Sequence, residues 1–169
     1  EYAEALKGVV LQVEARMGKQ VLEVRSDNEF RSYTLHRFFR DRGTVQNFTV
    51  PHSPSQNGMA ERSIGTSMEM VRPCLMASGL PLNFWSDAVL YSNYVLDCLP
   101  TTSVEVEKTP YEIYYGKKPH TQFLKPFGAA CFGFLPVANR INKSLGARAV
   151  KCKYLGPSED QKGFRLWIP

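Results

Sequence analysis

The sequence predicts an α/β fold, with alternating helices and short strands over residues 1–119 and a small strand-rich part over residues 120–169. Two observations predict this class. In the first part, apolar residues recur at helical spacing in several segments, and short apolar runs lie between them. In the second part, three short β-type runs are separated by Gly, Pro and Asn, as in a small barrel.

The amino-terminal elements are predicted by apolar periodicity. The first helix carries an apolar stripe and should end at Gly18; the stripe consists of Leu6, Val9, Val10 and Val13. Residues 21–24 follow as a short buried strand, whose carboxyl end leads to Asp27. We expect a helix over residues 30–42 that closes at Gly43, and then a strand over residues 44–50.

The strongest helix start comes next. Ser53 can act as N-cap with Pro54 in the first turn, and Gln56 completes a capping box. Counted at 100° per residue, Glu61 projects toward the apolar stripe of this helix and Arg62 points away; the stripe is Ile64, Met68, Val71 and Leu75. Pro73 should end or kink the helix near Arg72, because proline lacks the N–H and clashes with the preceding turn.

The remaining elements have clear start signals. Gly79-Leu80-Pro81 precedes a mostly apolar helix that reaches about Leu99, and Thr109-Pro110-Tyr111-Glu112 begins a short one. The strands of the second part are expected within residues 127–136, 151–156 and 163–167.

Composition excludes several classes. With 169 residues and 43% hydrophobic residues the chain can build a real core, and it has no apolar run of the roughly 18 residues that span a bilayer. The four cysteines are far apart, without the paired spacings that hold zinc, so we expect reduced core thiols in an intracellular protein. The absence of an initiating Met points to a fragment.

Charge is concentrated near the carboxyl terminus. The net charge is +5, and residues 120–158 contain six cations and no acid. These cations are Lys125, Arg140, Lys143, Arg148, Lys151 and Lys153. The alternative is a solubilising surface, but such a run favours contact with phosphates.

Two acidic residues stand out as candidate metal ligands. Asp27 follows a predicted strand, and Glu61 lies on a predicted helix, so their carboxylates can converge only through the fold. Simpler roles are a helix N-cap for Asp27 and a solvated carboxylate for Glu61. The inward projection of Glu61 makes its simpler role less favoured, because an unpaired carboxylate on a buried side is costly.

Several blocks, in order along nearly the whole chain, resemble the integrase of Ty1/copia-type retrotransposon polyproteins. The blocks are Arg25-Ser26-Asp27-Asn28-Glu29-Phe30, Pro51–Arg62, Gly79-Leu80-Pro81 with Phe84-Trp85, Thr109–Glu112, Gly116-Lys117-Lys118-Pro119, Phe127-Gly128, and Tyr154-Leu155-Gly156 with Gly163–Leu166.

The resemblance implies a partial RNase H-like integrase core over residues 1–119, its first strands missing, and a basic SH3-like domain over residues 120–169. It implies a strand-transfer site with two Mg²⁺ or Mn²⁺ ions, which activate a water or 3′-hydroxyl for attack on phosphate. By the match, Asp27 is the second catalytic Asp and Glu61 the catalytic Glu, both metal ligands. Asn28, Asn57 and Gly58 would line the site.

Departures from the family pattern reduce the expected activity. The first catalytic Asp should lie upstream, and no acid before Asp27 stands in a matching context. Two glycines that the family has after Asn28 are deleted, and Ser63-Ile64-Gly65 replaces residues expected to contact DNA. We therefore expect weak metal binding and no integration by this chain alone.

The function predicted is that of a retrotransposon integrase fragment that acts in DNA integration. Its partners would be element and target DNA, RNA as a further candidate, and other copies of the chain, but no membrane; it would act in the nucleus or in a cytoplasmic particle. Predicted nucleic-acid contacts are Arg62, Arg140, Lys143, Arg148, Lys151 and Lys153. The alternatives are a non-catalytic nucleic-acid-binding module, which would also use arginines of residues 31–42, and an RNase H-like nuclease remnant.

Overall fold

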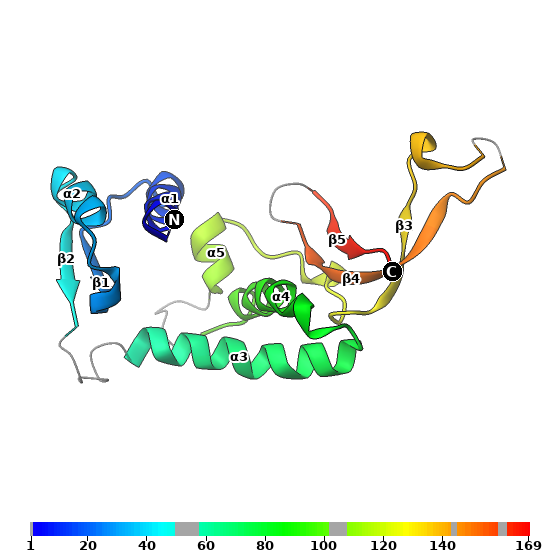
Figure 1. Ribbon diagram of the computed structural model, residues 1–169, viewed down its shortest axis with the longest axis horizontal. Coiled ribbons are helices and arrows are strands. Elements are labelled where there is room, and N and C mark those ends of the chain that lie inside the picture. The colour runs from blue at the N-terminus through cyan, green and yellow to red at the C-terminus, as the bar shows by residue number, and fades with distance from the viewer. Residues whose placement is uncertain (1, 50–57, 102–107, 143–144, 159–161) are drawn as a thin grey trace. The chain divides into compact units, whose positions relative to one another are not determined.

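The computed structural model describes residues 2–49, 58–101, 108–142, 145–158 and 162–169 (Figure 1). The chain forms two compact units, Glu1–Ile64 and Gly65–Pro169. Each unit has its own hydrophobic core. No helix in the described ranges is both long enough and apolar enough to cross a membrane.

The first unit packs two helices beside a parallel pair of strands. Its elements are α1 (Tyr2–Met17), β1 (Glu23–Ser26), the 3-10 helix η1 (Asn28–Phe30), α2 (Tyr33–Asp41) and β2 (Val45–Phe48). β1 pairs in parallel with β2, from Glu23 opposite Val45 to Ser26 opposite Phe48. Val10 of α1 and Leu35 and Phe39 of α2 form the buried centre.

Both helices of this unit end where the sequence predicts. Gly18 and Gly43 follow the helices with φ of 61° and 70°, a left-handed conformation that glycine adopts without strain. Thr44 is buried next to Gly43, and its hydroxyl donates to the Val21 carbonyl at 2.8 Å. This contact ties the start of β2 to the segment that precedes β1.

Two boundaries in the first unit were predicted wrongly. The strand expected at residues 21–24 is β1, which begins at Glu23 and is half-exposed, because the Val21 N–H instead donates to the Glu14 carboxylate at 2.9 Å. The helix expected from Phe30 begins at Tyr33. The chain first makes a 3-10 turn, in which the Arg31 N–H donates to the Asn28 carbonyl at 3.1 Å.

The second unit combines helices with a three-stranded antiparallel sheet. The helices are α3 (Gly58–Ser78, which begins in the first unit), η3 (Leu82–Phe84), α4 (Trp85–Asp97), α5 (Pro110–Tyr115), η4 (Thr121–Phe123) and η5 (Val137–Asn139). The strands are β3 (Ala130–Phe134), β4 (Ala149–Pro157) and β5 (Phe164–Trp167), in the order β3-β4-β5. The three expected strand segments are thereby confirmed.

The core of the second unit joins helices to the sheet. It contains Val71 and Leu75 of α3, Ala88 and Tyr91 of α4, and also Leu80, Phe127, Tyr154 and Leu155. Arg165 of β5 adds an ion pair with Asp87 of α4 at 2.8 Å and a hydrogen bond to the Leu155 carbonyl. The packing of this unit therefore crosses residue 119, where the sequence suggested a division between domains.

α3 differs from its prediction in three respects. It continues through Pro73 to Ser78, where an end or kink near Arg72 was expected. Pro73 is exposed, and the helix is held by Val71 and Leu75, which are buried on either side of it. The predicted cap at Ser53, Pro54 and Gln56 lies outside the described residues.

The third difference concerns the exposure of side chains in the first half of α3. Ile64 is 65% exposed and Glu61 is exposed, whereas Val71 is 1% exposed. The buried face of α3 therefore begins well after Glu61, so the expectation that Glu61 points toward a buried side was wrong. Apolar periodicity identifies a face of a helix, but it does not say where along the helix that face is covered.

The four cysteines, Cys74, Cys98, Cys131 and Cys152, are free thiols, and Cys98 and Cys152 are buried. Burial raises the pKa of the Cys98 thiol. A raised thiol pKa keeps this side chain protonated and unreactive, in keeping with a role in the core.

Candidate catalytic carboxylates and basic surface

Asp27 and Asn28 lie at the carboxyl ends of the paired strands. Asp27 directly follows β1, and the Asn28 side-chain amide donates to the carbonyl of Thr49, which follows β2, at 3.2 Å. The Thr49 N–H in turn donates to the Ser26 carbonyl at 3.0 Å. These bonds fix the two strand ends to each other and hold Asp27 and Asn28 at one edge of the sheet.

Asp27 directly precedes η1 and is not the N-cap of α2, the helix for which a capping role was considered. Ser32 is the N-cap of α2. Asp27 instead accepts a backbone hydrogen bond from the Phe30 N–H at 3.4 Å through its main-chain carbonyl. The Asp27 side chain is half-buried.

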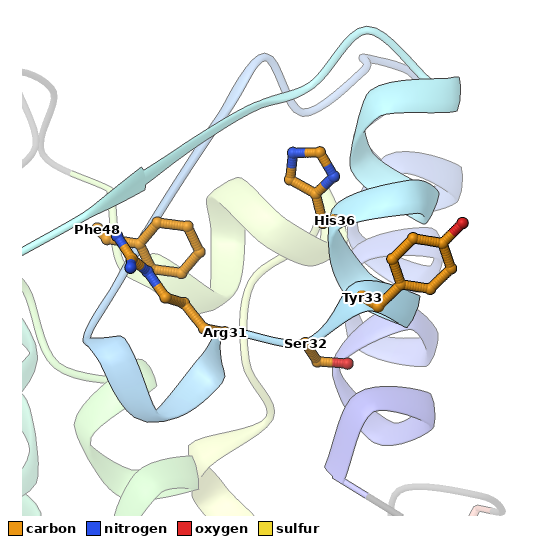
Figure 2. A pocket seen from close by; sticks show the side chains of 5 residues that line it. All are labelled: Arg31, Ser32, Tyr33, His36 and Phe48. Carbon is orange, nitrogen blue, oxygen red and sulfur yellow. The ribbon is translucent and has the colours of Figure 1, made fainter.

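An open hollow of about 400 Å³ lies beside this edge, in the first unit (Figure 2). Its lining consists of Arg31, Ser32, Tyr33, His36 and Phe48. Figure 2 shows Arg31 next to the Phe48 ring, and the guanidinium lies 4.7 Å from the ring centroid. This cation–π contact fixes the side chain of Arg31, the residue that follows η1.

The second carboxylate, Glu61, lies in the first turn of α3. Gly58 opens the described part of this helix, and a side chain in its place would come 3.6 Å from the Arg62 guanidinium. Arg62 therefore folds back toward the helix start. Asn57, predicted to line the site, lies outside the described residues.

The described residues do not assemble a complete metal centre. In the described ranges, no three His, Cys, Asp or Glu side chains form a group that could hold a metal ion. Asp27 and Glu61 have carboxylate oxygens, which Mg²⁺ prefers, and with Asn28 they offer a donor set that suits this ion chemically. Their convergence on one ion stays a prediction.

The cations of residues 120–158, the basic tail, differ in their surroundings. Arg148 and Lys151 are exposed, whereas the Lys153 ammonium donates to the Ser78 carbonyl at the end of α3. Arg140 donates from Nε to the Leu135 carbonyl at 3.0 Å. Lys143 lies outside the described residues. Among the described tail cations, Arg148 and Lys151 face solvent close together at the start of β4, and Lys125 is exposed outside the sheet.

Arginines of the first unit are largely occupied by the protein itself. Arg42 forms an ion pair with Glu14, and Arg37 and Arg40 both approach the Asp41 carboxylate. At the start of β1, hydrogen bonds from Asn47 and Arg25 hold the pKa of the Glu23 carboxyl below its usual range. This unit is therefore a weaker candidate for phosphate contact than the tail.

The sequence reasoning missed two exposed aromatic residues on β3. Phe132 is 76% exposed and Phe134 is 73% exposed, on the same face of the strand. Their alternation with the half-buried Cys131 and the buried Gly133 is the signal that could have identified them.

No family model matches the chain, but it is similar to curated transposon polyproteins. The retrovirus-related Pol polyprotein from transposon TNT 1-94 of Nicotiana tabacum is 31% identical over 159 residues, which cover 93% of this chain and 12% of that polyprotein. The polyprotein from transposon RE2 of Arabidopsis thaliana is 28% identical over 158 residues, 93% of this chain and 11% of that polyprotein. The chain spans roughly a tenth of the length of these curated relatives.

Solved structures give a likeness of fold. A chain of the simian T-cell lymphotropic virus intasome in complex with PP2A regulatory subunit B56 gamma matches 98% of this chain with a TM-score of 0.51 and 14% identity, over 62% of that chain. The HTLV-2 integrase catalytic core domain in complex with magnesium, in its trimeric form, has a TM-score of 0.47 and 20% identity, over 66% of this chain and 69% of that one.

The class of protein is therefore an integrase-like α/β segment, as predicted. Its homologues are Ty1/copia-type retrovirus-related Pol polyproteins, and the chain is similar to one segment of them. The SH3-like assignment of residues 120–169 stays a prediction.

Proposed function

We propose that this segment acts in DNA integration by a retrotransposon Pol polyprotein, where it contacts DNA through the basic surface of its carboxyl-terminal part. The observation that carries the proposal is the homology to transposon Pol polyproteins along 93% of the chain. Because integration takes place on host DNA, the expected location is the nucleus.

DNA contact is supported by the exposed cations. Arg148 and Lys151 lie at the start of β4 in a stretch, residues 120–158, that has no acidic residue. Exposed cations without acidic neighbours attract phosphates and release bound counterions. Arg62 on α3 is a further exposed cation.

A divalent metal ion, Mg²⁺ or Mn²⁺, would be held by Asp27 and Glu61, with Asn28 and Gly58 beside them. When bound, such an ion supplies Lewis acidity toward a phosphate oxygen. With two carboxylates, the chain itself binds the ion weakly, because Mg²⁺ at such sites relies on substrate phosphates for further ligands. The role of Asp27 is to fix the ion to the rigid edge of the β1–β2 pair.

Self-association is the third component of the proposal. Large apolar side chains are exposed near the junction of α3 and α4, where Met76 is 84%, Leu82 78% and Trp85 59% exposed. Exposed apolar groups of this size are frequent at protein interfaces. The fold is similar to that of one chain in a solved intasome, an assembly of the kind that such contacts would support.

A non-catalytic nucleic-acid-binding role is the second candidate. It is favoured by the basic face of β4, which needs no metal ion. RNA as a partner has no separate support in the structure or in the relatives, so it enters as an outcome of the experiments.

The test is duplex DNA binding measured over a range of salt concentrations. The chain should bind with a negative log-log slope, and the double variant Arg148→Ala, Lys151→Ala should flatten that slope by up to about 2, since each phosphate contact contributes roughly −0.9. Lys19→Ala, at an exposed lysine of the first unit, is the matched control. An unchanged slope in the double variant, or no binding by the parent chain, would contradict the proposal.

A further inference from the structure

The β3–β4 hairpin has one closed face and one open face. On the closed face, a side chain added at Gly133 would come 2.9 Å from the Cys152 sulfur and 3.2 Å from Leu166, so no space remains there. On the open face, Phe132 lies opposite Lys151 and Phe134 opposite Ala149. Both phenylalanine rings are about three-quarters exposed, whereas the core aromatics Phe127 and Tyr154 are almost fully buried.

Cations surround these two rings. Lys151 pairs directly with Phe132 across the strands, and the Arg140 guanidinium lies 5.3 Å from the Phe134 ring centroid. Arg140 is held in place by its hydrogen bond to the Leu135 carbonyl. Arg148 immediately precedes β4 and is exposed. The sequence of the hairpin contains no acidic residue that would neutralise these charges.

Rings and cations in this arrangement match the chemistry of a single-stranded nucleic acid. Residues two apart on a strand are about 7 Å apart, so each ring can stack with a separate base. Unpaired bases have free faces for such stacking, while their phosphates are attracted to the cations. The bases of a duplex are stacked on each other and are not available to these rings.

We propose that the open face of the β3–β4 hairpin, formed by Phe132, Phe134, Arg140 and Lys151, binds unpaired nucleotides of a single strand. The proposal rests on the proposed function, because it assigns to the same basic surface a second type of DNA substrate. A second copy of the same face is not the expected partner, because the cations of the two copies would repel each other with no acidic residue between them.

The experiment compares oligothymidine with a duplex of the same length, using the 169-residue chain and the double variant Phe132→Ala, Phe134→Ala. Both rings are exposed, so the variant should keep the thermal unfolding midpoint of the parent. Its affinity for oligothymidine should fall at least about fivefold, because stacking on aromatic side chains contributes strongly per base. Its affinity for the duplex should remain at the parent value. Phe123→Ala, at a ring that is 53% exposed on η4, is the matched control and should change neither affinity.

The results distinguish single-strand binding from self-association at this face. Parent-like binding of oligothymidine by the double variant would overturn the inference, and so would an equal loss for the duplex. A shift from oligomer to monomer in sedimentation, with unchanged oligothymidine binding, would assign the face to a second copy instead. If the parent chain binds neither nucleic acid, the proposed function fails as well. The same loss with oligouridine would extend the site to single-stranded RNA.

Discussion

Lys151 and Lys153 lie two residues apart on the same face of β4 but have different surroundings. Lys151 is exposed, whereas Lys153 donates to the carbonyl of Ser78, which is 6% exposed at the end of α3. The last carbonyls of a helix have no partner within the helix, so this bond satisfies a group that would otherwise be buried without one. Lys153 is therefore a link between sheet and helix, and Lys151 is available to DNA.

Replacing Lys153 with Met should destabilise the chain, because the Ser78 carbonyl loses its donor while the aliphatic packing is kept. We expect the free energy of unfolding in urea to fall by roughly 1 to 3 kcal/mol. Lys151→Met should change this free energy by less than about 0.5 kcal/mol, as at an ordinary surface position, but should weaken duplex DNA binding. Equal destabilisation by the two variants would contradict the roles assigned to them.

At this scale the sequence correctly predicted a strand that ends just before Asp27, but it wrongly predicted that Glu61 points toward a buried side. A strand that ends before Asp27 could be predicted because strand and turn signals are local. The environment of Glu61 could not, because it depends on which part of α3 is covered by other elements. Likewise, the six tail cations could be counted in the sequence, but the hydrogen bonds of Arg140 and Lys153 could not be predicted. The partner of Lys153 is distant in the sequence, and that of Arg140 is set by the local turn.

Residues at the two ends of α5 determine where this helix begins and ends. Thr109 and Glu112 form a capping box, in which the Thr109 N–H donates to the Glu112 carboxylate at 2.9 Å and the Glu112 N–H donates to the Thr109 hydroxyl at 3.2 Å. Gly116 closes the helix with φ of 67°. The helix start was predicted from these residue types, since a capping box acts through residues three apart.

The capping box should make stability depend on pH. The Thr109 N–H, followed by the Thr109 hydroxyl, holds the pKa of Glu112 below its usual value of 4.5. A lowered carboxyl pKa means that the ionised form stabilises the fold above that value, and that this contribution is lost as the pH falls through the folded-state pKa. The stability difference between the parent and Glu112→Gln, measured by thermal unfolding, should therefore shrink in acid.

Two further variants complete that experiment. Thr109→Ala should lower the free energy of unfolding by roughly 0.5 to 2 kcal/mol, as is typical for loss of an N-cap. Glu69→Gln, at an exposed position of α3, controls for the change in net charge. A stability difference for Glu112→Gln that grows as the pH falls would contradict the assigned role of the carboxylate.

Elements whose boundaries depend on tertiary contacts were predicted less well. β1 starts two residues later than expected because the Glu14 carboxylate binds the Val21 N–H. α3 passes through Pro73 because the helix is anchored on both sides of the proline. Neither Glu14 nor the core around Val71 is visible in a window of local sequence, so propensity was overridden by packing.

For the molecule as a whole, local sequence patterns predict the α/β class and the order of the elements. The distribution of charge along the chain does not predict where its two compact units divide. The basic tail differs in composition from the rest of the chain, and yet Phe127, Tyr154 and Leu155 share a core with α3 and α4. Gly128 shows how close this packing is: φ is 75°, and a side chain there would come 2.3 Å from the Ser78 Cβ. A change in composition along a chain therefore does not by itself mark a boundary in its packing.

We propose that Asp27 and Glu61 together bind one divalent ion. The most direct measurement is an Mn²⁺ titration followed by paramagnetic broadening of amide NMR signals, in the parent chain, Asp27→Asn and Glu61→Gln. We predict that amides next to Asp27 and next to Glu61 broaden together, and that either substitution removes the broadening at both places. Broadening next to Glu61 that survives Asp27→Asn, or broadening at neither carboxylate, would contradict the claim.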